Sequence, residues 1–591
     1  MVNRFLVTTA LEETWPENLE TPALLLGEWC RLYSRKEYWS QLNAKILPYH
    51  WDDRNKLYLD YKYIQVFYEK ILKSLADELN NIHKVDHSLR YWRILLGSWL
   101  GYFIQMLFDR WSSIDQALNL NSIDETIILD FPSDSFVSQG MFDFSNYYTS
   151  DEWNHYIYGK ILESKSTVSI KYYSTDPFQL YYSTDPFQLN VNTSNISIKR
   201  LLVKLLEYYS SFFSRNDKYF FMETYLPHKT QLELEIKLGQ LPKFWRNIIA
   251  PKIIPNKIKR DWEIELNPSS EFEAIAIKLI TKMLPILYFE GYHSLVKFAS
   301  KLPWPNNPKI IWTSNACNND DVFNIYAAEK LESGAKLIIG QHGGHYGIGK
   351  WYFNEKHEIA ISDKYLTWGW RDPKETKVVP IGQLKNKKPF GVDHNLKKCL
   401  LMVCLTVPRY SYHMYSIIVS RQYLDYLEDQ FLFVNALPNY IKSNLTVRLL
   451  KNDYGWDQKM RWNDHSPKIK LDLGEKSIDE LIIKSRIYVS TYNASTFLES
   501  LTMNIPTVIF WNPNHWELRK FSKPYFNELL KVKIFHKTPE SAAEHIVSIW
   551  DNVDKWWNDS LTKNAVKNFT EIYSKINHNL VNSLYKEIRL A

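Results

Sequence analysis

The sequence predicts an α/β protein with two domains, each built on a sheet of parallel strands. The chain has 591 residues, which is too long for a single core of ordinary size. Short apolar runs alternate with stretches in which apolar residues recur every three or four positions, as in strands connected by helices. A segment rich in Gly, Lys and Asn at 382–399 separates two such series. We therefore expect one domain over residues 1–385 and a second over 398–591.

The first domain is expected to contain strands and a large helical insertion. Helical spacing of apolar residues fills Tyr58–Trp111 and Lys199–Leu302. Within the first of these, Ile94–Phe108 is strongly apolar but shorter than the roughly 20 residues that a membrane-spanning helix needs, so we expect a buried or interfacial helix. The strands are predicted at 4–10, 23–29, 126–131, 309–316, 336–343 and 377–382.

The second domain has the clearer pattern of a parallel sheet. Most of its apolar runs are separated by enough residues for a helix that crosses from one strand to the next. Its strands are predicted at 400–408, 445–451, 486–491, 507–511 and 532–536.

Composition excludes several classes of protein. The formal net charge is +6, from 72 basic and 66 acidic residues, which is too even a balance for a nucleic-acid binder. The four cysteines show no Cys-x-x-Cys spacing, so neither a disulfide framework nor a thiolate zinc site is predicted. The first residues, MVNRFLVTTALEETW, lack the apolar core of a secretory signal. We expect a cytoplasmic protein without a nucleic-acid partner.

One segment of the second domain has the pattern of a nucleotide site. SRIYVSTYNASTFLESLTMNIPTVIFW, at 485–511, reads as a strand, a polar turn, a helix, a second turn and a strand. Its turn residues would lie at the carboxyl end of a parallel strand and the N-terminus of a helix, where backbone amides favour a phosphate. The candidate donor-binding residues of this turn are Thr491, Asn493, Ser495 and Thr496.

Two further residues extend this predicted donor site. Glu499 follows one turn into the helix, where a carboxylate can accept hydrogen bonds from ribose hydroxyls. The alternative is that Ser495 or Thr496 caps the helix, with Glu499 completing a capping box or lying exposed. Arg409 follows an apolar strand and Pro408, and its planar guanidinium suits a donor phosphate.

A glycine-rich loop follows another predicted strand in the sequence IIGQHGGHYGIGKW, from Ile338 to Trp351. It matches neither the P-loop nor the GxGxxG pattern, but its glycines let the backbone approach a ligand closely. We predict His342 as a general base or as a hydrogen-bond donor to a phosphate or sugar, with Gln341, Gly343 and Gly344 on the acceptor side. Alternatively, His342 satisfies a buried carbonyl, or it binds zinc with His345 and His357, although no cysteine accompanies them.

A second candidate base lies near the N-terminus. In TTALEETW, Glu13 follows the first strand and can deprotonate an acceptor hydroxyl; the alternative is ordinary electrostatics at a helix start. The sequence contains no Asp-x-Asp, so transfer that uses this motif to bind a metal and a nucleotide diphosphate is disfavoured. We expect neither a metal nor another cofactor.

Several long segments resemble a family of transferases found in surface-carbohydrate and O-antigen gene clusters. They are TTALEETWPENLETPALLLGEWCRLYSRKEYW at the N-terminus, HSLRYWRILLGSWLGYFIQMLFDRW at 87–111, and QHGGHYGIGKWY with YLTWGW. More distantly, the chain is similar to capsule transferases that use CMP-linked sugar acids and to polyol-phosphate transferases. The architecture resembles GT-B glycosyltransferases, which implies two Rossmann-like domains facing a cleft.

This resemblance implies a glycosyltransferase that uses a nucleotide sugar and a glycan acceptor. It also implies a lipid-linked acceptor and peripheral contact with the inner face of the cytoplasmic membrane. Two alternatives remain: a transferase of polyol phosphate that uses a CDP-alcohol, and a non-catalytic GT-B-like scaffold in polysaccharide assembly.

Overall fold

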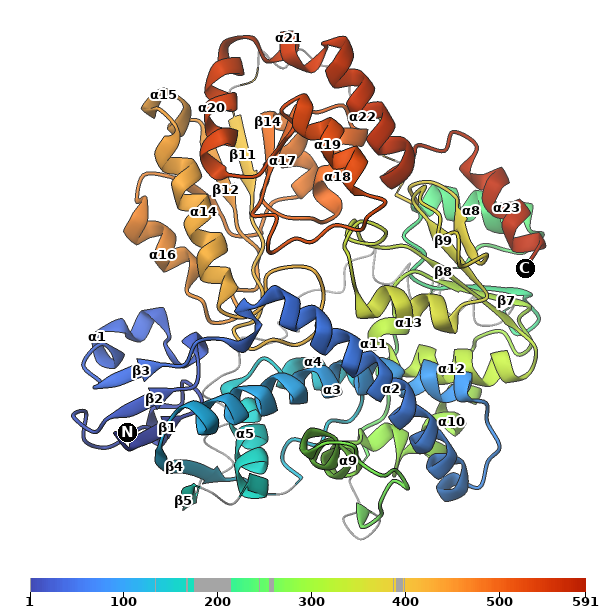
Figure 1. Cartoon of the computed structure of the whole chain (residues 1–591). Coiled ribbons are helices and arrows are strands. Elements are labelled where there is room, and N and C mark those ends of the chain that lie inside the picture. Colours follow the sequence, from blue (N-terminus) through green and yellow to red (C-terminus); the bar gives the residue numbers. More distant parts are fainter. Residues whose placement is uncertain are drawn as a thin grey trace, which may run out of the picture.

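Three parallel β-sheets, each packed with helices, make up the part of the chain that the computed structural model describes (Figure 1). This part comprises residues 2–132, 134–165, 168–174, 214–243, 245–253, 260–385, 387–389, 397 and 399–591. The predicted α/β fold class with parallel sheets is confirmed. The sequence predicted one sheet before residue 385, whereas the structure has two there.

The first sheet has the strand order β3-β2-β1-β4-β5. The chain leaves this sheet after β3 for two long helices, α2 (Arg54–His83) and α3 (Leu89–Leu120), before it returns in β4. The helix α5 (Asp151–Lys165) then leads towards β5. The five strands are β1 (Arg4–Val7), β2 (Ala23–Leu25), β3 (Ala44–Ile46), β4 (Ile123–Asp130) and β5 (Ser169–Ser174).

Helices α2 and α3 cross the middle of the molecule (Figure 1). The Ser88 hydroxyl caps α3 by accepting a hydrogen bond from the Tyr91 amide at 3.2 Å. Beyond this cap, apolar side chains around most of α3 are buried against α2, α5, α12 (Asp321–Glu332) and α13 (Phe353–Ile361). The expectation of a buried helix at 94–108 is therefore confirmed, and among the described residues no helix is both long and apolar enough to cross a membrane.

The second sheet has the order β10-β9-β8-β7-β6. Its edge strand β6 falls within the stretch for which the sequence predicted only helices. The strand was missed because it is short and has little apolar pattern. The described α-helices in that stretch include α8 (His228–Lys237), α9 (Glu271–Met283) and α10 (Tyr292–Ser300). The strands are β6 (Tyr219–Phe221), β7 (Ile310–Thr313), β8 (Lys336–Gly340), β9 (Lys364–Thr367) and β10 (Val378–Pro380).

The third sheet has the order β13-β12-β11-β14-β15-β16. Helices α14 (Gln422–Ala436) and α20 (Pro539–Ile549) pack together on it, as do α18 (Ser495–Thr502) and α22 (Ser560–Tyr573). The remaining helices of this region include α16 (Gln458–His465), α17 (Ile478–Lys484) and α19 (Lys523–Lys531). The strands are β11 (Cys399–Val403), β12 (Leu445–Arg448), β13 (Lys470–Asp472), β14 (Ser485–Ser490), β15 (Thr507–Phe510) and β16 (Phe535–His536).

The last helix, α23 (Leu580–Arg589), leaves the third sheet and packs against α8 beside the second (Figure 1). Its buried side chains recur every four residues, at Leu580, Leu584 and Ile588, and join an apolar cluster with residues of β6 to β9. On the way, the Lys575 amide donates to the Trp368 carbonyl and the Lys575 carbonyl accepts from the Gln383 amide, both at 2.8 Å. The chain therefore passes between the second and third sheets at two places, near Gln383 and near Lys575, which lie side by side.

Candidate functional site

The third sheet reverses its strand order between β11 and β14. From β11 the chain continues to β12 and β13 on one side, whereas β14 continues to β15 and β16 on the other. The loops that follow β11 and β14 therefore diverge at the carboxyl edge of the sheet. Open α/β sheets bind their ligands at such a reversal, and the predicted donor-binding residues follow these two strands.

Helix α18 begins at this reversal, directly after β14. No described side chain caps it: Ala494 occupies the N-cap position. The Ser495 hydroxyl instead accepts a hydrogen bond from the Gly344 amide at 3.0 Å, and the Thr496 hydroxyl accepts one from Tyr488 at 2.7 Å. The alternative that either residue caps the helix is therefore wrong. The first amides of α18 are suited to an anion.

The glycine-rich loop after β8 packs directly on this turn. A Cβ atom on Gly344 would lie 2.5 Å from the carbonyl of Ala494, so only glycine allows the two backbones to approach so closely. Gly347 has a φ of +74°, which also favours glycine. The loop therefore joins the carboxyl edges of the second and third sheets.

His345 holds the same two loops together. The Asn493 amide nitrogen lies 3.3 Å from Nδ1 of His345, and because an amide nitrogen only donates, Nδ1 is the acceptor. Nε2 therefore carries the proton and faces the Ser416 hydroxyl at 3.4 Å. Burial and the Arg519 charge lower the pKa of His345 to about 3, so His345 is a neutral bridge.

His342 lies on the same loop and is partly open to solvent, with 17% of its side chain exposed. Nε2 is 3.1 Å from the Tyr346 hydroxyl, and Nδ1 is 3.8 Å from Oε1 of Glu358. Burial lowers the pKa of His342 to about 4, so its imidazole is neutral at pH 7. A neutral imidazole can accept a proton, as the predicted general base requires.

Glu358, on α13, lies behind His342 and is fully buried. Its carboxyl group accepts hydrogen bonds from Tyr346 at 2.8 Å, Asn318 at 3.2 Å and Tyr365 at 3.2 Å. Burial raises the pKa of Glu358 to about 8, against the lowering effect of these donors. Buried carboxyl groups of this kind are concentrated at functional sites.

Glu499 faces the second sheet rather than solvent. It is buried, and Oε1 accepts a hydrogen bond from Lys385 Nζ at 2.7 Å, so the alternative of an exposed Glu499 is wrong. Lys385 Nζ also lies 5.7 Å from the ring centre of Tyr225, whose ring is 6.0 Å from that of His342. These contacts bring Glu499 and His342 into one cluster between the two sheets.

Two of the predicted residues support the loops. The Thr491 hydroxyl is buried and donates to the Val403 carbonyl at 2.9 Å, which ties the end of β14 to the end of β11. Gln341 is buried and accepts hydrogen bonds from the Trp368 amide and the Trp370 indole at 3.0 and 2.9 Å. Its own amide donates to the Gly343 carbonyl at 2.8 Å, so Gln341 shapes the glycine-rich loop from within.

Arg409 and Glu13 lie elsewhere: Arg409 bridges the third sheet to the first, and Glu13 follows the first strand of the first sheet. The buried guanidinium of Arg409 pairs with Asp151 at 2.5 Å and donates to the Trp29 carbonyl, and Asp151 raises the pKa of Arg409 against the effect of burial. Asp151 also accepts from the Ala10 amide at 3.2 Å. Glu13 is exposed on a short helix, Glu12–Thr14, after β1. The predicted residues thus fall into two groups.

Sequence reasoning missed three members of the cluster around His342, namely Glu358, Lys385 and Tyr225. Glu358 and Lys385 have no motif around them in the sequence. Tyr225 follows the unpredicted strand β6, and both Glu223 and Tyr225 have positive φ angles, of 51° and 63°. Such angles are uncommon for residues other than glycine and are frequent at functional sites.

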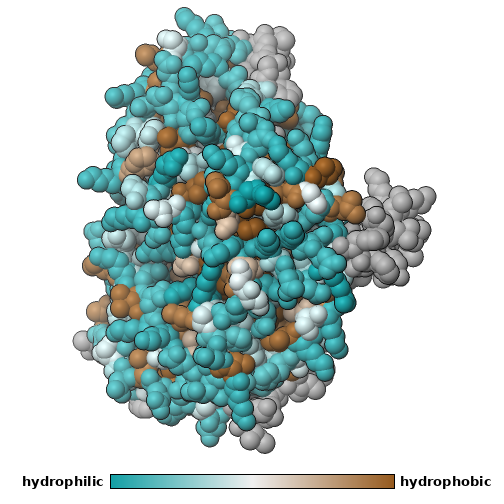
Figure 2. Space-filling view, turned by 90° about the vertical axis from the view of Figure 1, so that its right-hand side faces the viewer, coloured by the Kyte–Doolittle hydropathy of each residue, from teal (hydrophilic) through white to brown (hydrophobic). Residues whose placement is uncertain are grey.

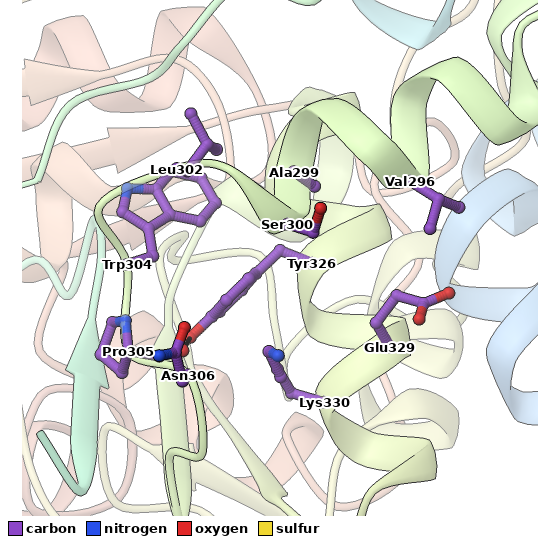
Figure 3. A pocket seen from close by; sticks show the side chains of 10 residues that line it. All are labelled: Val296, Ala299, Ser300, Leu302, Trp304, Pro305, Asn306, Tyr326, Glu329 and Lys330. Atoms are coloured by element: carbon purple, nitrogen blue, oxygen red, sulfur yellow. Dashed lines mark hydrogen bonds between the residues drawn. The ribbon is translucent and has the colours of Figure 1, made fainter. Parts of the chain in front are cut away.

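Among the described residues, no group of three or more His, Cys, Asp or Glu side chains is arranged to hold a metal ion. A small hollow of about 60 Å³ lies between α10 and α12 and shares no residue with the glycine-rich loop (Figure 3). Tyr326, Lys330 and Trp304 point towards it. Its volume suits a few water molecules rather than a nucleotide.

A protein-family model described as "LIC12162 family transferase" matches residues 4–588. No curated protein matches the chain. Solved structures show only weak likeness. WaaG, described as a glycosyltransferase involved in lipopolysaccharide biosynthesis, is 8% identical, covers 51% of this chain and 95% of its own, and has a TM-score of 0.28.

Two further structures are comparable. The wall teichoic acid polymerase TagF, as its H444N variant, is 12% identical over 50% of this chain and 86% of its own, with a TM-score of 0.28. The N-terminal domain of trehalose-6-phosphate phosphatase from Candida albicans is 11% identical over 65% of this chain and 92% of its own, with a TM-score of 0.31.

Proposed function

We propose that this chain, which belongs to the LIC12162 family of transferases, transfers a glycosyl group from a nucleotide-activated sugar to a growing surface glycan. The observation that carries this proposal is the N-terminus of α18. It has no side-chain cap, lies where the third sheet reverses its strand order, and is covered by the loop that contains His342. At this position the free backbone amides and the dipole of α18 favour the binding of a nucleotide diphosphate.

The donor contacts come from the turn after β14 and from α18. The first amides of α18, with Ser495 and Thr496, bind the diphosphate, while Thr491 and Asn493 hold the turn in place through their own hydrogen bonds. Glu499 accepts from the ribose hydroxyls and keeps its ion pair with Lys385. Binding therefore requires the Gly344–Ser495 contact to loosen, so that the phosphates reach the helix.

His342 is the proposed general base. The oxygen of the acceptor hydroxyl forms a bond to the anomeric carbon, and the bond from that carbon to the phosphate oxygen breaks, with its electron pair leaving on the nucleotide diphosphate. The hydroxyl proton passes to Nε2 of His342, which the acceptor reaches in place of Tyr346. Because the Tyr346 hydroxyl donates its proton to Glu358, Nε2 carries the imidazole proton in the free protein. The role of base therefore requires the other tautomer, in which Nδ1 carries the proton and faces Glu358, 3.8 Å away. Glu13 is the second candidate base, from the first sheet.

The acceptor is proposed to be lipid-linked, and the protein to work at the inner face of the cytoplasmic membrane without a metal ion. The support is the resemblance of TTALEETW, QHGGHYGIGKWY and YLTWGW to surface-carbohydrate transferases and the lack of Asp-x-Asp. The glycine-rich loop, with Gly343 at its partly exposed turn, is the part of the second sheet that faces the acceptor.

The first test is the melting temperature of the purified protein with CMP, CDP, UDP, GDP and dTDP, since a ligand of the native state raises it by mass action. We expect one base to give the largest shift and Ser495→Ala with Thr496→Ala to reduce it. A response to CDP followed by transfer from a CDP-alcohol would support the polyol-phosphate alternative. No response in folded protein would contradict donor binding and favour the scaffold.

A further inference from the structure

A basic groove lies at the opposite edge of the second sheet, away from His342. It has a volume of about 720 Å³, within the range of ligand-binding sites. Five of its lining residues are Lys or Arg and none carries an acidic side chain. These basic residues are Lys218, Lys309, Lys330, Lys336 and Arg589.

The strand register brings three of the lysines to the same end of the sheet. Tyr219 pairs with Ile310, which places Lys218 beside Lys309, whereas Lys336 pairs with Ile310, one position further along. Lys218 and Lys309 directly precede β6 and β7, and Lys336 is the first residue of β8. The Lys309 amide donates to the Lys218 carbonyl at 2.7 Å, and the Lys336 amide donates to the Lys309 carbonyl at 2.9 Å. Neighbouring strands lie about 4.8 Å apart, so the three backbones are adjacent at this edge of the sheet, and all three lysines line the groove.

The other two basic residues come from helices. Lys330 lies near the end of α12, and Arg589 is the last residue of α23. Among the described residues, Lys218, Lys309, Lys330 and Arg589 form no ion pair, and Lys336 meets Asp363 at 3.5 Å. Asp363 is itself bound by Arg90 at 2.7 Å. The five positive charges of the groove therefore exceed the negative charge beside it, which comes from Asp363 and from the terminal carboxylate of the lining residue Ala591.

The surface around the groove is polar. Figure 2 views the side on which β7 and the end of α23 lie in Figure 1, and most of this face is hydrophilic, with hydrophobic residues scattered among the hydrophilic ones. An apolar partner would require a contiguous hydrophobic patch. Clustered cations that outnumber their acidic neighbours instead raise the local concentration of anions.

We propose that this groove binds a ligand with clustered phosphate groups. Each lysine contributes a mobile ammonium group with three donors, and Arg589 contributes a planar fork that contacts two phosphate oxygens at once. The groove is separate from the proposed donor site because it lies at the amino ends of β6, β7 and β8, whereas the His342 loop leaves the carboxyl end of β8.

Calorimetric titration with inorganic pyrophosphate tests the proposal. We expect binding by the unmodified protein that weakens as salt is added, because exposed charges are screened. The triple variant Lys218→Gln, Lys309→Gln, Lys336→Gln should lose at least tenfold in affinity. Arg589→Gln, on a separate element, should weaken binding independently. Lys567→Gln, an exposed lysine of α22, is the control for loss of one positive charge outside the groove.

A second arm identifies the source of the phosphates. Co-sedimentation with phosphatidylcholine vesicles, with and without phosphatidylglycerol, reports on lipid headgroups, whereas pyrophosphate represents a soluble ligand. Binding in either arm that the triple variant loses and the Lys567 variant keeps supports the groove. The proposal is overturned if the triple variant and Arg589→Gln bind both probes as well as the unmodified protein does, or if the unmodified protein binds neither. None of these readouts depends on glycosyl transfer.

Discussion

The backbone amide of Gly344 donates a hydrogen bond to the side chain of Ser495 at 3.0 Å, across the boundary between the second and third sheets. This contact places the partly exposed His342, two residues earlier, beside the N-terminus of α18. The proposed base and the proposed phosphate site thus share one junction, although 151 residues separate its two halves in the sequence.

Replacing Gly344 with alanine should disrupt this junction. The new Cβ would lie 2.5 Å from the backbone of Ala494, and we expect a loss of about 2 kcal/mol in the free energy of unfolding, as for other overpacked sites. Urea unfolding measures it. Gly343→Ala is the matched control, since its Cβ would meet only the Tyr346 ring, at 3.1 Å. Equal stability of the two variants would contradict the close approach.

Replacing His342 with glutamine should abolish transfer while donor binding remains. Loss of a general base costs about 10²- to 10⁴-fold in kcat, and His342 makes no contact that the nucleotide site requires. Turnover with the identified donor, alongside its dissociation constant, separates the two effects. His578→Gln, an exposed substitution near α23, is the control. Full turnover in the His342 variant would exclude His342 as the base and leave Glu13 as the candidate.

Glu358 should make stability depend on pH. Burial raises its pKa from 4.5 to about 8, so the folded protein binds this proton more tightly than the unfolded chain does. The stabilisation is complete below the unfolded pKa and is lost as pH rises through about 8. The Glu358→Gln variant should lack this loss. The difference in free energy of unfolding between the variant and the unmodified protein should therefore change with pH between about 4.5 and about 8.

Urea unfolding of both proteins across this pH range measures the difference, and Glu544→Gln, an exposed substitution on α20, serves as the control. A constant difference between the Glu358 variant and the unmodified protein would show that the carboxyl group titrates alike in the folded and unfolded states.

Replacing Glu499 with glutamine should weaken donor binding about tenfold, since a hydrogen bond to a charged group contributes about 1.5–3 kcal/mol. The dissociation constant of the nucleotide measures this loss. Lys385→Met, which removes the partner of Glu499 at 2.7 Å, should lower stability, because it leaves a buried carboxylate without its cation. Unchanged affinity in the Glu499 variant would exclude the residue from the donor site.

Arg409 should act mainly on stability. Its replacement by glutamine leaves Asp151 without its partner at 2.5 Å, and breaking a buried ion pair costs about 3–5 kcal/mol. Thermal and urea unfolding measure this loss. A variant with normal stability and weakened donor affinity would instead support the predicted contact with a donor phosphate.

The sequence predicted most inner strands and both long helices, because these elements have strong apolar patterns. Four of the strands it missed, β3, β5, β6 and β13, lie at sheet edges. Edge strands are short and half-solvated, so their sequences lack the continuous apolar run of an inner strand. The split of the N-terminal region into two sheets was missed because neither β6, an edge strand, nor β9, an inner strand, had a recognised pattern.

At the site, the residue types in the sequence identified the two loops, but they did not identify the residues that contact those loops. The QHGG loop and the STYNAST turn both lie where a parallel strand ends, and the structure joins them. Their partners could not be predicted, because Lys385, Glu358 and Tyr225 reach the cluster only through the packing of distant segments. The QHGG and Trp-Gly-Trp segments, which were noted together in the sequence, are in contact in the structure, because Gln341 accepts hydrogen bonds from Trp368 and Trp370.

The return of α23 to the second sheet limits how the third sheet can move. The polypeptide crosses between them twice, near Gln383 and Lys575, and these crossings are hydrogen-bonded side by side at 2.8 Å. We expect two adjacent covalent connections to resist sliding of one sheet past the other more than rotation about the line that joins them. We therefore expect the Gly344–Ser495 contact to open by rotation about that line, with a displacement of α18 that grows with its distance from the crossings.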